Sequence, residues 1–313
     1  MYSCLFLYSL KGLFMIRLGY ACINTTLPSA SSTMRRATFD KSGLSYAGDI
    51  IVKNLKNLLI ILEWNNLNGV NVYRMSSELM PWASEYCLDS LPQYDEIKYL
   101  LRAIGSYAKQ TNQRLTFHPG QFNCLGSDKE NVILNSIKDL EIHAHIMDLM
   151  GLSKTPYNKI NIHLGSACNG QHDYAMENFC RNFERLSDSV KSRLTLENDD
   201  KKGMFSVKML YDGIYKKVGV PIVYDQHHFQ LGPQDTTQEE AIHMAFETWK
   251  GIRPVCHHSN SRKTYEDPSV VPTAHSDYYY EPFIDYDLEV DVVLEAKMKE
   301  QALLRYRNTW GGN

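Results

Sequence analysis

Histidine and carboxylate side chains recur along this chain, each at the end of a short apolar run of residues. Their positions, from the third run to the eighth, are His118, His163, Glu197, Asp225, His227, His228, His257, His258 and Glu295, and His275 follows the seventh run. Imidazole and carboxylate ligands together suit Zn²⁺, Mn²⁺ or Fe²⁺. Two or three such ions close together can activate a water molecule and stabilise both oxygens of a phosphodiester displacement. If these side chains converge, the sequence predicts a multi-metal hydrolytic site.

The positions of these residues within their runs support convergence. A charged group inside a strand is costly unless it is paired or metal-bound, and the cost is lower at the strand end. Side chains alternate along a strand, so Thr116 and His118 share one face, as do Asn161 and His163. Alternation leaves two adjacent pairs undecided: His227 with His228, and His257 with His258. Four histidines on helical patterns are instead expected to be structural: His143, His145, His172 and His243.

Short β-rich runs alternate with longer helical patterns along the chain. The predicted strands are 17–22, 70–77, 114–119, 159–165, 193–198, 221–228, 253–259 and 291–297. The predicted helices are 42–66, 93–110, 129–151, 174–192, 205–217 and 237–250. Gly151 and Gly219 are expected to end two helices, and Asp128 to cap the third. Segment 260–290 is expected to be a long loop with a short helix.

Eight strands with intervening helices predict a single (β/α)₈ TIM barrel, an α/β fold in which all strand ends meet at one rim. No GxGxxG sequence follows the first strand and no Walker A sequence occurs, so an open nucleotide-binding sheet lacks its usual support. We expect one domain, residues 17–313, after an N-terminal extension, residues 1–16. That extension is apolar but too short to span a bilayer, and Met15 is an alternative start.

The composition is that of an ordinary globular protein: 313 residues, 43% hydrophobic and 22% charged, with a formal net charge of -3. A strongly basic balance would have indicated nucleic acid, but a metal cluster adds local positive charge that a residue count omits. Seven cysteines without a CxxC pair indicate free thiols in a reducing compartment. We therefore expect a soluble, intracellular protein, in the cytoplasm or, in a eukaryote, in the nucleus or an organelle.

Eight runs of sequence form a pattern that extends over nearly the whole chain. They are GYACIN (19–24), YRMSSELMPW (73–82), TFHPGQFN (116–123), INIHLG (160–165), LEND (196–199), VYDQHH (223–228), AHSDYY (274–279) and VVLEAKMKE (292–300). This pattern resembles the UV-damage endonuclease family, part of the barrel superfamily that contains endonuclease IV and xylose isomerase. The resemblance implies a DNA repair nuclease that nicks immediately 5′ of a UV photoproduct (a pyrimidine dimer or a 6-4 photoproduct) and leaves a 3′-hydroxyl.

The resemblance also implies the ligands of two or three divalent ions, with manganese expected and zinc or magnesium as the alternatives. The ligands are His118, His163 and Glu197 for one ion; Glu197, Asp225, His258 and Glu295 for a second; and His228 and His275 for a third. Glu197, Asp225 and Glu295 would be the catalytic carboxylates. In the family a lysine, sometimes carboxylated, can stand two residues before the seventh-strand histidine, where this chain has Cys256. Because a thiol cannot form a carbamate, the third ion position is expected to differ.

Four further residues are implied to contact DNA. Gln121 and Phe122 resemble a wedge that enters the duplex where the lesion is extruded, and an aromatic ring can fill the vacated stack. Tyr20 and Asn24, on the first strand and its loop, would contact the damaged site. The implied partner is double-stranded DNA with UV lesions. We expect no membrane association and no obligate protein partner, and we expect a monomer.

Other functions remain open from the residues alone. An apurinic-site endonuclease of the endonuclease IV type would share the metals but not the pair Gln121 and Phe122. A metal-dependent sugar isomerase or epimerase would use a smaller, carboxylate-rich pocket and a base or lysine for proton or hydride transfer. The histidine-rich rim disfavours the isomerase, and the complete ligand set disfavours a catalytically inactive binding module.

Overall fold

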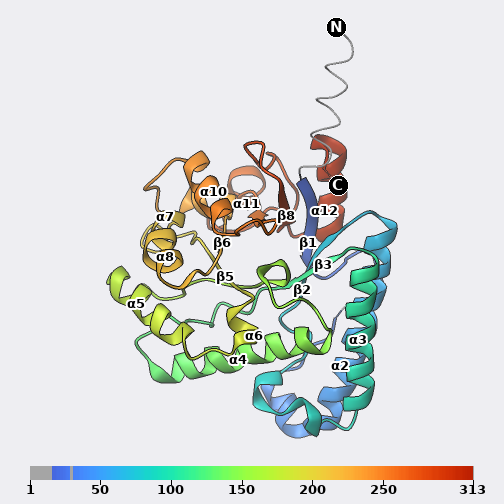
Figure 1. The fold of residues 1–313 in the computed structure, drawn as a ribbon. Coiled ribbons are helices and arrows are strands. Elements are labelled where there is room, and N and C mark those ends of the chain that lie inside the picture. Colours follow the sequence, from blue (N-terminus) through green and yellow to red (C-terminus); the bar gives the residue numbers. More distant parts are fainter. Residues whose placement is uncertain (1–15, 29–30, 313) are drawn as a thin grey trace.

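Eight parallel strands form the centre of the computed structural model, which describes residues 16–28 and 31–312 (Figure 1). The strands are β1 (Ile16–Cys22), β2 (Val72–Met75), β3 (Arg114–Phe117), β4 (Ile160–Ile162), β5 (Leu194–Glu197), β6 (Ile222–Val223), β7 (Val255–His258) and β8 (Val290–Leu294). They pair in the order β6-β5-β4-β3-β2-β1-β8-β7. A parallel bridge between Asp225, just after β6, and His257 of β7 brings the two ends of the sheet together. The predicted TIM barrel is therefore confirmed.

Helices surround this barrel on its outside (Figure 1). They are α2 (Arg36–Leu67), α3 (Tyr94–Gln110), α4 (Glu130–Leu149), α5 (His172–Phe183), α6 (Asp188–Lys191), α7 (Val207–Leu210), α8 (Lys216–Val218), α9 (Gln226–Leu231), α10 (Gln238–Glu247), α11 (Arg262–Tyr265) and α12 (Lys299–Trp310). Short 3₁₀ turns η1 (Ala83–Glu85), η2 (Leu88–Ser90) and η3 (Pro156–Asn158), and a π turn η4 (Tyr211–Tyr215), complete the elements. Within the described part of the chain, no helix combines the length and apolarity needed to cross a membrane.

Two of the three predicted helix-end residues, Gly151 and Gly219, lie where they were expected. Gly151 follows the end of α4 with a φ of 68°, and Gly219 ends α8 with a φ of 73°, a backbone conformation that costs glycine little. Asp128, however, does not cap α4. That helix begins at Glu130 after Lys129, and no side chain makes a capping hydrogen bond there. The expected extension lies outside the described residues, Met15 included, except that Ile16 begins β1.

The sixth strand is much shorter than expected, because a helix begins within the predicted range. The side chain of Asp225 accepts a hydrogen bond from the backbone N–H of His228 at 2.7 Å and so caps α9. His227 and His228 therefore lie on a helix, where alternation between strand faces no longer applies. The predicted helix 174–192 is likewise divided, since Ser187 caps a separate short helix, α6.

A buried charge cluster occupies the barrel end opposite the rim that carries the histidines. Asp291, at the start of β8, is fully buried and accepts hydrogen bonds from Arg17, Arg114 and Arg253 at 2.6–2.8 Å. Although burial opposes the charged form, the guanidinium groups of Arg17 and Arg114 hold the pKa of Asp291 below its usual value. This cluster ties β1, β3, β7 and β8 together below the site.

Candidate metal centre

Glu197 lies at the centre of the rim, at the end of β5, and is 1% exposed. Its Oε2 faces the Nε2 atoms of His118 at 3.2 Å and His163 at 3.9 Å. Its Oε1 faces the Nδ1 atoms of His257 at 3.1 Å and His228 at 3.3 Å. Because the two oxygens face different pairs of imidazoles, this carboxylate has the geometry of a bridge between two ions.

Three groups of side chains at the rim each bring their ligand atoms within 4.8 Å of one another. The groups are His118, His163 and Glu197; Glu197, Asp225 and His228; and Asp225, His257 and Glu295. The first two groups share Glu197, and the last two share Asp225. The rim therefore offers a continuous series of three subsites joined by carboxylates.

An unpaired atom in these groups shows that they suit a cation. Asp225 is fully buried, and its Oδ2 has no hydrogen-bond partner within the described part of the chain. Leaving a buried polar group unsatisfied costs about 1–3 kcal/mol, and more for a charged one. A divalent cation would satisfy this oxygen, and a mixed imidazole and carboxylate set suits Mn²⁺, Zn²⁺ or Fe²⁺. The residues present therefore fit a resident divalent metal.

The protonation of the imidazoles is compatible with metal binding. Burial lowers the pKa of His118 to about 4, and burial also lowers the pKa of His257. Both rings are therefore neutral at pH 7 and can each offer a lone pair. Burial opposes the charged form of His228, but the carboxylates of Asp225 and Glu197 outweigh it and raise its pKa to about 9. A cation in these groups would replace that proton as the partner of the carboxylates.

Comparison with known proteins identifies the family of this chain. The family model of the UV-endonuclease UvdE matches residues 16–310. The chain belongs to this UV-endonuclease family. The crystal structure of SacUVDE is similar, with a TM-score of 0.81 and 30% identity over 94% of this chain and 97% of that one.

Two curated relatives of the UV-endonuclease family differ in length. The UV-damage endonuclease of Schizosaccharomyces pombe is 35% identical over 308 residues, which cover 92% of this chain and 49% of the relative. This chain therefore spans about half the length of that relative. The UV DNA damage endonuclease of Bacillus cereus (strain B4264) is 32% identical over 309 residues, 93% of each protein.

The seventh strand places His257 at the site, whereas the family resemblance had selected His258. His257 Nδ1 lies 3.2 Å from Glu295 Oε1, in addition to its contact with Glu197. His258 points the other way: its Nε2 lies 3.0 Å from the backbone oxygen of Glu281, and its ring stacks on Tyr279 at 5.3 Å. We therefore replace His258 by His257 as the proposed ligand.

Because the family's lysine stands two residues before the seventh-strand histidine ligand, choosing His257 in place of His258 moves the corresponding position from Cys256 to Val255. Two residues before His257 stands Val255, which cannot be carboxylated either. Cys256 is buried, and burial raises the pKa of its thiol far above the usual range, so that it stays protonated. A different third ion position therefore stays a prediction, and Cys256 is not proposed as a ligand.

His275 lies beside the centre but in none of the three groups. Its Nδ1 is 3.0 Å from the backbone oxygen of Glu295 and 3.8 Å from Glu295 Oε2, and its ring meets that of His227 edge-on at 5.8 Å. If Nδ1 donates to the backbone oxygen, Nε2 is the ring atom available to an ion. We keep His275 as a proposed ligand of a third ion, together with His228.

Sequence reasoning did not identify the side chains that orient the ligands. Asn161 donates a hydrogen bond to Glu197 Oε2 and accepts one from Thr195 at 2.8 Å. Arg74 pairs with Glu295, and Lys159 Nζ lies 3.1 Å from His257 Nε2. The sequence could have indicated Arg74 and Lys159, because each is a charged residue inside or directly beside an apolar strand. A fourth contact, from Asp199 to His163 Nδ1 at 3.0 Å, comes from the loop after β5 and had no such signal.

Tyr20 and Asn24 were expected to contact the damaged site, but their polar atoms are used within the protein. Tyr20 is fully buried, and its hydroxyl donates to Asn65 at 2.8 Å and accepts from Asn24 Nδ2 at 2.9 Å. The Oδ1 of Asn24 accepts the backbone N–H groups of Thr26 and Leu27. Because their polar atoms order the first loop, both residues are assigned a structural role, and we do not propose them as lesion contacts.

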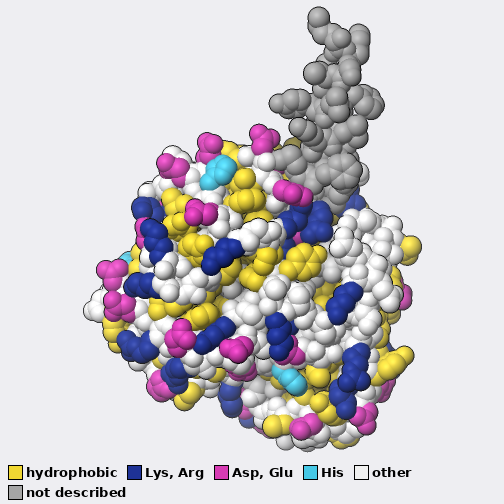
Figure 2. All heavy atoms as spheres, viewed as in Figure 1, with side chains coloured by type: hydrophobic (Ala, Val, Ile, Leu, Met, Phe, Trp, Pro, Cys, Tyr) yellow, Lys and Arg dark blue, Asp and Glu magenta, His cyan; other side chains and the backbone are white. Residues whose placement is uncertain are grey.

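Five of the candidate ligands line an open cavity of about 540 Å³: His118, His163, Glu197, His228 and Glu295. Its wall includes Gln121, in the loop after β3, and Lys201, in the loop after β5. Next to Gln121, Phe122 is 83% exposed, which is unusual for a large apolar ring. On the face of the molecule in Figure 2, lysine and arginine side chains are scattered among acidic ones and do not gather in one patch. The loop after β3 therefore presents a large exposed ring next to the cavity wall.

Proposed function

We propose that this chain is a metal-dependent DNA repair endonuclease that incises the strand immediately 5′ of a UV photoproduct and leaves a 3′-hydroxyl. Membership of the UV-endonuclease family supports the reaction class. The observation that carries the proposal is the series of three ligand groups, joined by Glu197 and Asp225, of which each has at least one member that lines an open cavity. Two or three ions, manganese by family resemblance, would occupy these groups.

Each carboxylate has a proposed task in the reaction. Divalent cations, when bound, would stabilise negative charge on the reacting phosphate and make a water nucleophile available at neutral pH. Glu197 and Asp225 would bridge neighbouring ions, and Glu295 would complete the set with His257. Arg74, held by Glu295 and lining the cavity, is placed to donate to a phosphate oxygen. These residues would fix the phosphate above the rim.

The loop after β3 would select damaged DNA. A lesion weakens stacking and so lowers the cost of opening the duplex, which is a few kcal/mol for an intact base. Phe122, exposed next to Gln121 at the tip of this loop, would enter the opened stack, and Gln121 would face the lesion from the cavity wall. Membership of the UV-endonuclease family favours a photoproduct over an abasic site as substrate.

Incision of UV-irradiated DNA tests the proposal. A duplex with one photodimer should be nicked in the presence of Mn²⁺ and not with excess EDTA, and a polymerase should extend the product from its 3′-hydroxyl. Glu197→Gln should abolish the nick. An abasic duplex in parallel reports the alternative activity. Preferred cutting of the abasic duplex, or unchanged cutting by Glu197→Gln, would overturn the assignment.

A further inference from the structure

The loop after β3 has an exposed tip and a buried foot. We call residues 120–123 the wedge loop. Gln121 and Phe122 are exposed at its tip, whereas Asn123 at its foot is 6% exposed. A pocket of about 330 Å³ lies beside this loop, and Gly120, Phe122 and Asn123 line it. On that side, open space and not packed side chains borders the loop, so hydrophobic packing does little to fix the tip.

Asn123 makes the polar contacts that close the wedge loop. Its backbone N–H donates to the carbonyl of Gly120 at 3.1 Å, and its side-chain Nδ2 donates to the same oxygen at 3.0 Å. The Nδ2 also donates to Oδ2 of Asp139 at 2.7 Å. Both N–H bonds of the amide are thus used, one within the loop and one to helix α4. The next residue makes a second hydrogen bond to α4: the N–H of Cys124 donates to Ser136 Oγ at 2.8 Å.

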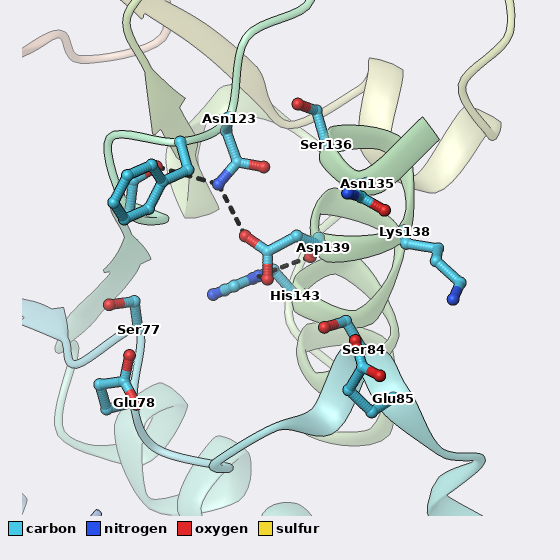
Figure 3. A pocket seen from close by; sticks show the side chains of 12 residues that line it. Ser77, Glu78, Ser84, Glu85, Asn123, Asn135, Ser136, Lys138, Asp139 and His143 are labelled. Atoms are coloured by element: carbon cyan, nitrogen blue, oxygen red, sulfur yellow. Dashed lines mark hydrogen bonds and ion pairs between the residues drawn. The ribbon is translucent and has the colours of Figure 1, made fainter. Parts of the chain in front are cut away.

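Asp139 is in turn held on a rigid element. It lies within α4, a helix of 20 residues, and the ring of His143 one turn later contacts its backbone oxygen at 2.6 Å and its Oδ1 at 3.6 Å. Figure 3 shows Asn123 reaching across the edge of the pocket to Asp139, with His143 on the far side of that carboxylate. His143 is 4% exposed and packs edge-on against Phe117 at the end of β3.

We propose that Asp139 is a positioning residue: through Asn123 it holds the wedge loop in the orientation in which Phe122 enters damaged DNA. This inference rests on the proposed function and deepens it. A loop fixed before binding loses less conformational entropy in the complex, so the exposed ring is presented ready to insert. Asp139 belongs to none of the three ligand groups and does not line their cavity, so its role is separable from metal binding.

The negative charge of Asp139 makes the sign of the mutational effect informative. Removing a carboxylate near a DNA-binding surface would by itself strengthen binding to phosphates. The positioning role predicts the opposite, weaker discrimination of damaged DNA. Glu141, on the same helix, offers a matched control, since it accepts hydrogen bonds from Ser187 at 2.6–2.8 Å and not from the loop.

The experiment compares Asp139→Ala, Asp139→Asn and Glu141→Ala in an otherwise unchanged protein. Asp139→Ala should lower kcat/KM for a photodimer duplex about tenfold, because small misplacements of a positioned group have effects of this order or larger. Asp139→Asn keeps an acceptor for Asn123 and should recover most of the activity. Glu141→Ala makes the same charge change and should leave the activity unaltered. Mn²⁺ affinity and the melting temperature should be similar in all three.

A double-mutant cycle with Phe122→Ala separates this role from general damage to the fold. If Asp139 acts through the ring, Asp139→Ala should add nothing in the Phe122→Ala background. The fluorescence of 2-aminopurine beside the photodimer, measured with EDTA so that no strand is cut, should rise on binding of the wild type and of Glu141→Ala but not of Asp139→Ala.

The outcomes distinguish the two levels of the argument. The positioning role would be overturned if Asp139→Ala lowered kcat/KM equally in the wild-type and Phe122→Ala backgrounds. It would also be overturned if Asp139→Ala kept wild-type activity and fluorescence while Phe122→Ala was impaired. Either result would leave the endonuclease proposal intact. An unimpaired Phe122→Ala would overturn the wedge itself, and with it the role of Asp139.

Discussion

At the scale of single residues, two adjacent histidines of β7 take opposite roles. His257 faces the carboxylates of Glu197 and Glu295, whereas His258 lies fully buried in an aromatic cluster with Tyr279. Sequence could not decide between them by alternation alone, because both adjoin the end of the strand. The pairing of β7 with β8 sets which ring points into the barrel, and this register is a property of the fold.

Substitution of each histidine tests this assignment. His257→Ala should weaken Mn²⁺ binding and incision at least about 100-fold, since even the outer partners of metal ligands affect affinity by 10–100-fold. His258→Phe should retain Mn²⁺ binding, because the ring is surrounded by aromatic side chains and not by ligands. Calorimetric titration with Mn²⁺ and an incision assay measure both effects. A greater loss of metal from His258→Phe than from His257→Ala would restore the family-based choice.

The buried histidines also predict how stability depends on pH. Burial lowers the pKa of His258 to about 4, below the value of about 6.5 in an unfolded chain. The unfolded state therefore binds the proton more tightly, so the contribution to stability is complete above pH 6.5 and is lost as pH falls toward 4. For this one residue the loss between pH 7 and pH 5 is about 2 kcal/mol. Urea unfolding of metal-free protein at the two pH values measures it.

His258→Phe supplies the comparison for that measurement, because phenylalanine does not titrate. The variant should lose less stability than the wild type on going from pH 7 to pH 5. An equal loss in both proteins would show that His258 is not the titrating group.

At the scale of elements, β4 arranges the site in layers. Lys159, Asn161 and His163 follow one another at a spacing of two and share a face, on which they contact His257, Glu197 and Asp199 in turn. The repeated strand and helix pattern predicted the barrel because it depends only on periodicity. It could not predict α9, because that helix begins where the Asp225 carboxylate accepts a single hydrogen bond from the backbone N–H of His228.

Asn161 provides a test of this layered arrangement. Asn161→Leu removes the donor to Glu197 and should lower Mn²⁺ affinity about 10–100-fold, the range observed for partners of metal ligands. Thr195→Val removes only the hydroxyl that orients Asn161 and should have a smaller effect. Metal titrations of both variants, with circular dichroism to confirm folding, give the comparison. Equal affinity of Asn161→Leu and wild type would mean that the fold alone orients Glu197.

At the scale of the whole molecule, the barrel separates stability from chemistry. The Asp291 cluster lies at one end of the strands and the metal centre at the other, with β8 contributing to both. The wedge loop and the loop with Lys201 both follow carboxyl ends of strands. The conformation of such a loop depends on single contacts, such as the hydrogen bond from Asn123 to Asp139. For this reason the barrel and the convergence of most candidate ligands at one rim follow from sequence. Which histidine of each adjacent pair faces the rim, and which contacts hold the loops, do not.

Removal of the Asp291 charge tests this separation. Asp291→Asn leaves Arg114 fully buried without its carboxylate and should destabilise the fold by about 3–5 kcal/mol. Glu289→Gln, which removes an exposed partner of Arg253, should cost no more than about 1 kcal/mol. Urea unfolding at pH 7 measures both. While folded, Asp291→Asn should bind Mn²⁺ normally, and loss of metal from the folded variant would show that the two ends are coupled.

The most direct measurement is an anomalous-difference map from crystals grown with Mn²⁺. The account predicts neighbouring peaks at the rim, bridged by Glu197 and Asp225, with His257 and not His258 in contact with an ion. A map without peaks at these carboxylates, or with manganese bound elsewhere on the barrel, would contradict the metal centre and the reaction built on it.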